Sequence, residues 1–166
     1  APIVGASNVT AGIKVPVATI GTTSQVINLG SGLTVTQVSS VANIAGSDNA
    51  GNLALNNNST ATLTFSSPVR LNIKHAGVNN AVNFDNGDRW EFNSNGATFT
   101  LQDPSSNLTI NSNANGVVNF TPKATVNNDL EDWKITTTRL SSITFKLVTG
   151  NTWSDINISV ACGFDF

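Results

Sequence analysis

Short runs in which apolar and polar residues alternate recur along almost the whole chain. In residues 33–36 and 60–65, for example, Leu, Val, Ala or Phe occupy alternate positions and Thr stands between them. An alternation of period two predicts strands that turn one face toward a core. Val, Ile, Thr and Phe favour strands, and Gly, Asn, Ser and Pro bound the runs. We expect strands at residues 25–29, 33–38, 52–55, 60–65, 69–74, 81–84, 89–92, 97–101, 108–110, 117–120, 133–138, 143–148 and 156–160.

Helical patterning is nearly absent, since only residues 126–133 could form one turn after an Asn cap. From about residue 50 to 120 the runs recur every 8 to 12 residues, separated by clusters of turn-forming residues. Asn86 and Gly87 give the strongest hairpin signal, because both tolerate positive φ angles. The spacing predicts an all-β chain, folded over residues 1–166 as a single antiparallel β-sandwich or jelly roll. A β-solenoid is the alternative, but no fixed period with a repeated residue pattern supports it.

The first 45 residues differ from the rest of the chain in composition. They contain no aromatic residue, and their one charged residue is Lys14. Two alternating stretches, 9–20 and 33–44, are compatible with ordinary strands of the sandwich. They are equally compatible with an assembly arm or strand-exchange segment that pairs with a neighbouring copy, because an uncharged strand edge favours strand addition.

Amides and hydroxyls, rather than charges, make this chain polar. It has 24 Asn, 20 Thr and 17 Ser among 166 residues, only 11% charged residues and a net charge of −2. The five Lys and three Arg do not cluster in the sequence, which argues against nucleic-acid binding. No apolar run approaches the roughly 18 residues of a membrane helix. The single cysteine excludes an internal disulfide, and the absence of Met with a start at Ala1 indicates a processed N-terminus.

Signals for catalysis are weak, and we expect no enzyme activity. His75 is the one histidine and has no Gly-x-Ser-x-Gly element near it, while Cys162 lies in an apolar segment typical of a buried thiol. A glycosidase needs two carboxyl groups that face each other. Glu91 and a residue of the acidic segment 129–132 would form such a pair only if the fold brought them together.

The most site-like cluster surrounds the predicted turn at residues 85–91. Asp85, Asn86, Asp88 and Glu91 supply oxygen ligands within seven residues, and Ca²⁺ prefers oxygen ligands. The cluster does not match the EF-hand pattern. It therefore predicts either a candidate calcium site or a polar hairpin tip. We expect the fold to require no cofactor.

Three tryptophans lie beside acidic or amide residues. Trp90 adjoins the acidic turn, Trp133 follows the segment 129–132, and Trp153 stands near Asn151 and Asp155. An exposed Trp ring can stack on a sugar while neighbouring polar groups bind the sugar's hydroxyls. The alternative for each of these tryptophans is packing in the core.

These features favour a non-enzymatic protein that acts at the cell surface, outside the cell or on a virion. The composition is similar in a general way to that of surface adhesins, filament subunits and virion proteins. We expect a self-assembling filament (pilus-like) or coat subunit whose partners are other copies of itself. The alternative is a lectin-type carbohydrate-binding module that uses Trp90, Trp133 and Trp153, with or without calcium. Neither interpretation predicts nucleic-acid binding or membrane insertion.

Overall fold

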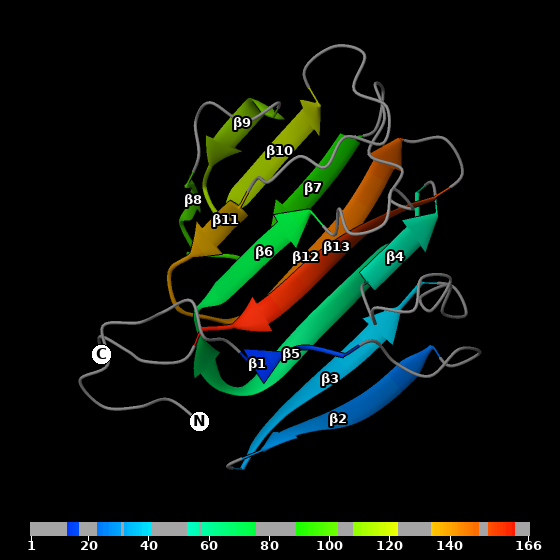
Figure 1. Ribbon diagram of the computed structural model, residues 1–166, viewed down its shortest axis with the longest axis vertical. Helices are drawn as coiled ribbons and strands as arrows, with labels where there is room; N and C mark the ends of the chain where they lie inside the picture. Colours follow the sequence, from blue (N-terminus) through cyan, green and yellow to red (C-terminus); the bar gives the residue numbers. More distant parts are fainter. Residues whose placement is uncertain are drawn as a thin grey trace.

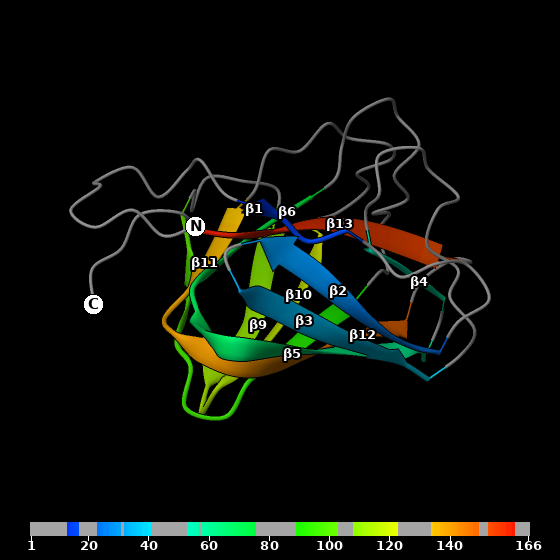
Figure 2. The ribbon, with the colours of Figure 1, turned by 90° about the horizontal axis from the view of Figure 1, so that it is seen from below.

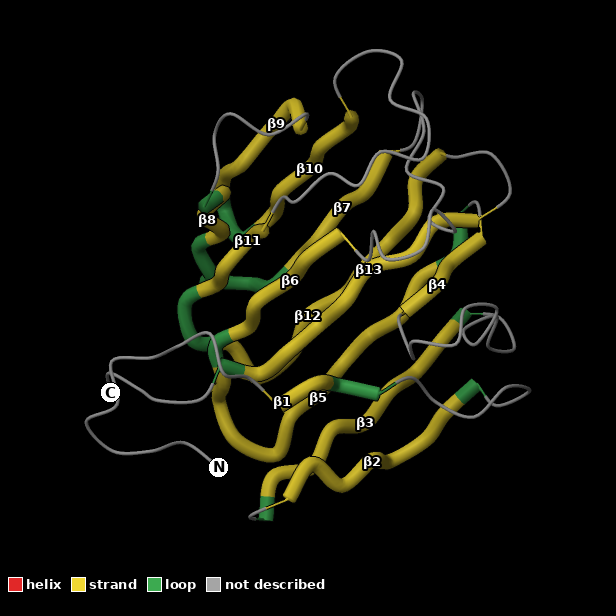
Figure 3. Tube along the Cα trace, viewed as in Figure 1, coloured by secondary structure: helices red, strands yellow, loops and turns green. Residues whose placement is uncertain are grey.

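The protein folds as two antiparallel β-sheets packed face to face, as a computed structural model shows (Figures 1 and 2). The structure describes residues 13–16, 23–30, 32–40, 53–56, 58–75, 89–102, 108–122, 134–149 and 153–161. All thirteen elements in these ranges are strands (Figure 3). The predicted all-β sandwich is confirmed. The alternative of a β-solenoid does not hold, because every recorded strand pair is antiparallel and the strands form two layers.

The larger sheet has seven strands in the order β2-β3-β5-β12-β7-β10-β9. Their bounds are Ser24–Gly30 (β2), Leu33–Ser39 (β3), Thr60–Val69 (β5), Leu140–Thr149 (β12), Arg89–Asn93 (β7), Val117–Pro122 (β10) and Leu108–Ala114 (β9). The long strands β5 and β12 pair at its centre, so segments about 80 positions apart in the chain lie side by side.

The smaller sheet has six strands, with the main order β1-β13-β6-β11-β8 and with β4 also paired to β13. Their bounds are Ile13–Lys14 (β1), Trp153–Val160 (β13), Leu71–His75 (β6), Lys134–Thr137 (β11), Phe99–Leu101 (β8) and Leu53–Asn56 (β4). Most consecutive strands lie in different sheets. Between β5 and β6 the chain changes sheet with Arg70 as the one intervening residue.

An aromatic cluster joins the two sheets in the core. The Phe92 ring centroid lies 4.9 Å from that of Phe145 and 5.0 Å from that of Phe120, both in edge-on geometry. Phe92 also contacts Trp90 in its own strand and Phe99 of the opposite sheet. Edge-on pairs at these distances are favourable, because the positive edge of one ring meets the negative face of the other. Phe92 therefore connects both layers of the sandwich.

The described part of the N-terminal segment pairs with the chain's own strands. Ile13 and Lys14 lie opposite Val160 and Ser159 in the smaller sheet. Strands β2 and β3 pair with each other, and β3 continues onto β5 in the larger sheet. The described strands among the first 45 residues thus belong to the two sheets of this chain.

A two-residue turn at Asn115 and Gly116 connects β9 to β10. Both residues have positive φ angles, of 55° and 78° respectively. Such a pair of angles is typical of the tight hairpin turns that suit the right-handed twist of paired strands. The hairpin predicted at Asn86 and Gly87, and the strand predicted at 81–84, lie outside the described residues.

Candidate functional site

The structure places Trp90 in the core, which corrects its prediction as a sugar platform. The Trp90 side chain is 0% exposed and packs edge-on against Phe92. A ring with no exposed surface has no face to offer a sugar. Trp133 lies outside the described residues. Trp153 begins β13 opposite Asn56, and its side chain is outside the described part of the chain.

Glu91 is the one member of the predicted calcium set that the structure describes. Asp85, Asn86 and Asp88 lie outside the described residues, so the calcium site stays a prediction. Within the described ranges, no three His, Cys, Asp or Glu residues gather as a metal site. Glu91 is also the one carboxylate among the described side chains. A pair of facing carboxyl groups is therefore not found in that part of the chain.

Glu91 belongs to a straight row of polar residues on the outer face of the seven-stranded sheet. Residues directly opposite in an antiparallel sheet share a face and lie about 5 Å apart. The register of β5, β12, β7, β10 and β9 thereby sets one residue from each strand side by side. These five residues, here called the polar row, are Thr60, Lys146, Glu91, Asn119 and Ser112.

Asn119 is the most enclosed member of the polar row. It is 4% exposed, although it lies on the outer face of the sheet. Its side-chain oxygen Oδ1 accepts a hydrogen bond of 2.8 Å from Nε of Arg89 and one of 3.4 Å from Nδ2 of Asn111. A β-bulge at this point of the β9–β10 pair brings both Asn111 and Ser112 near Asn119. The oxygen is thus satisfied twice.

The amide nitrogen of Asn119 has no hydrogen-bond partner among the described residues. Burying such a donor without a partner costs about 1–3 kcal/mol. The neighbouring carboxylate of Glu91 and the ammonium of Lys146 likewise have no hydrogen bond or ion pair within the described part of the chain. The Asn119 amide donor, the Glu91 carboxylate and the Lys146 ammonium therefore lie side by side, and each can still form hydrogen bonds.

Arg89 extends this group toward the next positions of the sheet. Its side chain is exposed, and the bond from Nε to Asn119 fixes the plane of the guanidinium. The remaining guanidinium nitrogens make no hydrogen bond or ion pair with other described residues. A guanidinium holds its N–H donors in a rigid planar fork. The bond from Nε to Asn119 therefore orients the other N–H donors of Arg89 but leaves them available for a further hydrogen bond.

An uncharged ladder of hydroxyls continues from the polar row across the same face. Thr62 and Thr144 have their Oγ1 atoms 2.8 Å apart, and the hydroxyls of Thr64 and Ser142 are 3.4 Å apart. These hydroxyls bond to each other across β5 and β12, so they stiffen the pair of strands. The face therefore changes from charged groups at the polar row to hydroxyls along the centre of the sheet.

The sequence identified Glu91 but missed its neighbours in the polar row. From the sequence, Asn119 and Lys146 are polar positions within the strands predicted at 117–120 and 143–148. The alternation of side chains along a strand could have indicated part of the site. It puts Arg89 and Glu91 on one face and Trp90 and Phe92 on the other. The order of the strands in the sheet decides which residues of different strands lie side by side. No local sequence pattern contains this order.

No helix in the described part of the chain is long and apolar enough to cross a membrane.

Comparison with known proteins finds one similar solved structure. No family model matches the chain, and no curated protein matches it. The solved structure is that of a pectin-binding carbohydrate-binding module, aligned over 83% of this chain and 91% of that chain. The identity is 21% and the TM-score is 0.40.

Proposed function

We propose that this chain is a non-enzymatic glycan-binding protein that acts outside the cytoplasm and holds its ligand on the polar row. The observation that carries the proposal is the unpartnered amide nitrogen of Asn119 beside Glu91 and Lys146. Polar groups that converge and are fixed in orientation are typical of ligand sites. A buried amide donor without a partner is satisfied when a ligand oxygen reaches it.

Sugar hydroxyls fit this set of groups, because each hydroxyl both donates and accepts. The Glu91 carboxylate accepts from one hydroxyl, while the Asn119 amide and the Lys146 ammonium donate to neighbouring oxygens. Four strand spacings make the polar row about 19 Å long. An extended glycan can therefore lie across the strands and contact several members of the row at once.

The test compares two variants of the polar row with a matched lysine on the other sheet. Glu91→Gln keeps the shape of the side chain but removes the charge, so we expect about tenfold weaker binding. Lys146→Gln is expected to weaken binding as well, whereas Lys134→Gln lies on the smaller sheet and is expected to leave it unchanged. Retardation in gels that contain neutral polysaccharides measures the affinity, after a glycan array has identified a ligand.

Two results would contradict the proposal. One is a wild-type protein that binds no glycan on the array. The other is an affinity that Glu91→Gln and Lys146→Gln both leave unchanged, since the polar row would then not be the contact.

A self-assembling subunit of a surface filament or coat is the second candidate function. It is favoured by Val26 and Val38, which are 64% and 47% exposed on the outer face near the edge strand β2. Strand β2 carries no charge, and an uncharged edge favours pairing with another strand. We expect the wild-type protein to form oligomers at high concentration and Val26→Lys to reduce them, as measured by light scattering. Strictly monomeric wild-type protein at every concentration would rule this candidate out.

A further inference from the structure

Two turns that contain the sequence Asn-Gly lie against each other beside strands β7 and β10. One turn, residues 94–97, follows the end of β7, and the other, residues 115–116, leads into β10. The amide of Ser94 donates a hydrogen bond of 2.7 Å to the carbonyl oxygen of Gly116. A third Asn-Gly pair, residues 86–87, lies outside the described residues. The two described pairs are the same dipeptide in the sequence, but the structure gives them different surroundings.

An Asn-Gly pair can modify itself in water, and asparagine is among the residues that are chemically unstable on heating. The backbone nitrogen of the glycine attacks Cγ of the asparagine side chain and forms a bond to it. The side-chain amide leaves as ammonia and takes the proton of the glycine N–H with it. One water molecule then opens the resulting succinimide ring at either of its two carbonyl carbons. One opening gives aspartate, and the other gives isoaspartate, in which the main chain runs through the former side chain. Glycine favours the attack because it has no Cβ to hinder the approach.

The turn at residues 94–97 is fixed at its ends and open at its centre. Ser94 and Ala97 are 4% and 6% exposed, and the amide of Ala97 donates a hydrogen bond of 3.0 Å to the carbonyl oxygen of Ser94. Asn95 and Gly96 are both exposed. Neither the side chain of Asn95 nor the amide of Gly96 makes a hydrogen bond to another described residue. The Asn95 side chain can therefore turn toward this amide without breaking a hydrogen bond within the described part of the chain.

The turn at residues 115–116 holds the same dipeptide more tightly. Gly116 is buried, and its carbonyl oxygen accepts the hydrogen bond from Ser94. A Cβ added to Gly116 would clash with the carbonyl group of Ser94, whereas a Cβ added to Gly96 would meet no atom within 4 Å. Closing a succinimide ring at Asn115 requires the main chain to rotate against these contacts. The reaction there has to wait for local opening of the hairpin.

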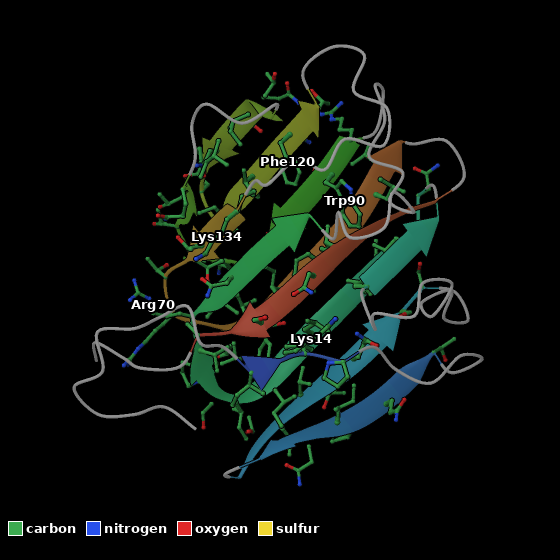
Figure 4. All side chains as sticks on the ribbon, in the orientation of Figure 1. Lys14, Arg70, Trp90, Phe120 and Lys134 are labelled. Atoms are coloured by element: carbon green, nitrogen blue, oxygen red, sulfur yellow. The ribbon has the colours of Figure 1, made fainter. Side chains whose placement is uncertain are left out.

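We infer that Asn95 is a site of spontaneous modification in the folded protein, where it converts to isoaspartate and aspartate, and that the fold protects Asn115. The reaction needs water alone and does not depend on the polar row or on any ligand. Isoaspartate adds one carbon to the main chain within a turn whose ends are fixed. The change disturbs the contact that joins β7 to β10, the strands on which Trp90 and Phe120 lie opposite each other in the core (Figure 4).

The experiment incubates the folded wild-type protein at physiological temperature in mildly alkaline buffer. Chymotrypsin, which cleaves after phenylalanine, then releases peptide 93–99 with Asn95 and a separate peptide ending at Phe120 with Asn115. Mass spectrometry detects the exchange of NH₂ for OH, fragmentation locates the modified residue, and a protein isoaspartate methyltransferase identifies isoaspartate. We expect conversion about tenfold faster at Asn95 than at Asn115, which equals a difference of about 1.4 kcal/mol between the two barriers.

An unfolded sample and a variant show whether the fold causes this difference. In concentrated urea both pairs lose their surroundings, so we expect Asn95 and Asn115 to react at similar rates. Gly96→Ala places a methyl group beside the attacking nitrogen and is expected to suppress the reaction at Asn95 while leaving Asn115 unchanged.

Thermal unfolding of incubated protein measures the structural effect of the modification. We expect the melting temperature of the converted wild-type protein to fall by about 2–4 °C, the shift that the loss of one hydrogen bond gives in a chain of this size. Asn95→Gln is the matched control, because a glutamine would have to close a larger ring. It is expected to keep its melting temperature through the same incubation.

Three results would overturn the inference. The first is an unchanged peptide 93–99 from folded protein when the unfolded sample has reacted, since the turn would then protect Asn95. The second is equal conversion of Asn95 and Asn115 in the folded protein, because the dipeptide alone would then set the rate. The third is a fully converted protein that melts at the temperature of the fresh one, which would remove the effect on the contact between β7 and β10.

Discussion

Gly116 is held in place both by its backbone angles and by a close neighbour. Its φ angle is 78°, and a Cβ atom added there would lie 2.2 Å from the carbonyl oxygen of Ser94. That same neighbour donates its amide hydrogen to the carbonyl oxygen of Gly116 over 2.7 Å. The turn between β9 and β10 therefore packs directly on the segment after β7. This contact helps to hold Asn119 and Glu91 in register.

Replacing Gly116 by alanine should lower the free energy of unfolding by more than the backbone angle alone explains. The positive φ costs a residue with a Cβ about 1–2 kcal/mol. The contact with Ser94 requires the backbone to move and adds to that cost. Gly96 is a matched control, because its φ is 81° but nothing lies within 4 Å of an added Cβ. Urea unfolding of Gly116→Ala and Gly96→Ala measures the two changes in the free energy of unfolding. Equal changes would show that the contact between residue 116 and Ser94 does not add to the cost of the positive φ angle.

At the scale of the strand, periodicity in the sequence predicted which residues face the core. Strand β12 shows this: Ile143, Phe145 and Leu147 are buried, and Thr144 and Lys146 alternate with them on the outer face. The same rule, applied to residues 89–92, puts Trp90 on the buried side with Phe92, so its burial was already implied by the pattern.

The neighbours of each strand could not be predicted in the same way. Lys146 stands beside Glu91, and Lys134 beside Lys74, only because non-local pairing sets the order of strands in each sheet. Long-range pairing depends on the whole hydrophobic core and on the connections between strands, and no window of a dozen residues contains it. The polar row is a product of that order.

At the scale of the whole molecule, the Phe92 cluster connects the two sheets through direct ring contacts. Phe92 lies on the seven-stranded sheet and contacts Phe99 of the smaller sheet, with ring centroids 6.4 Å apart. It also contacts Phe120 and Phe145 on the two strands that flank its own. Removing this ring takes away packing from both layers at once.

We expect Phe92→Ala to lower the free energy of unfolding by about 3–5 kcal/mol, the usual cost of removing a buried aromatic ring. Asn93→Ala, the next residue on the exposed side of the same strand, should change it by less than about 0.5 kcal/mol. Unfolding in urea, followed by far-ultraviolet circular dichroism and by tryptophan fluorescence, measures both. Because the cluster spans the sandwich, the two signals should change together in wild-type protein. Separate transitions would show instead that each sheet is stable without the other, and the loss in Phe92→Ala would then be confined to one of them.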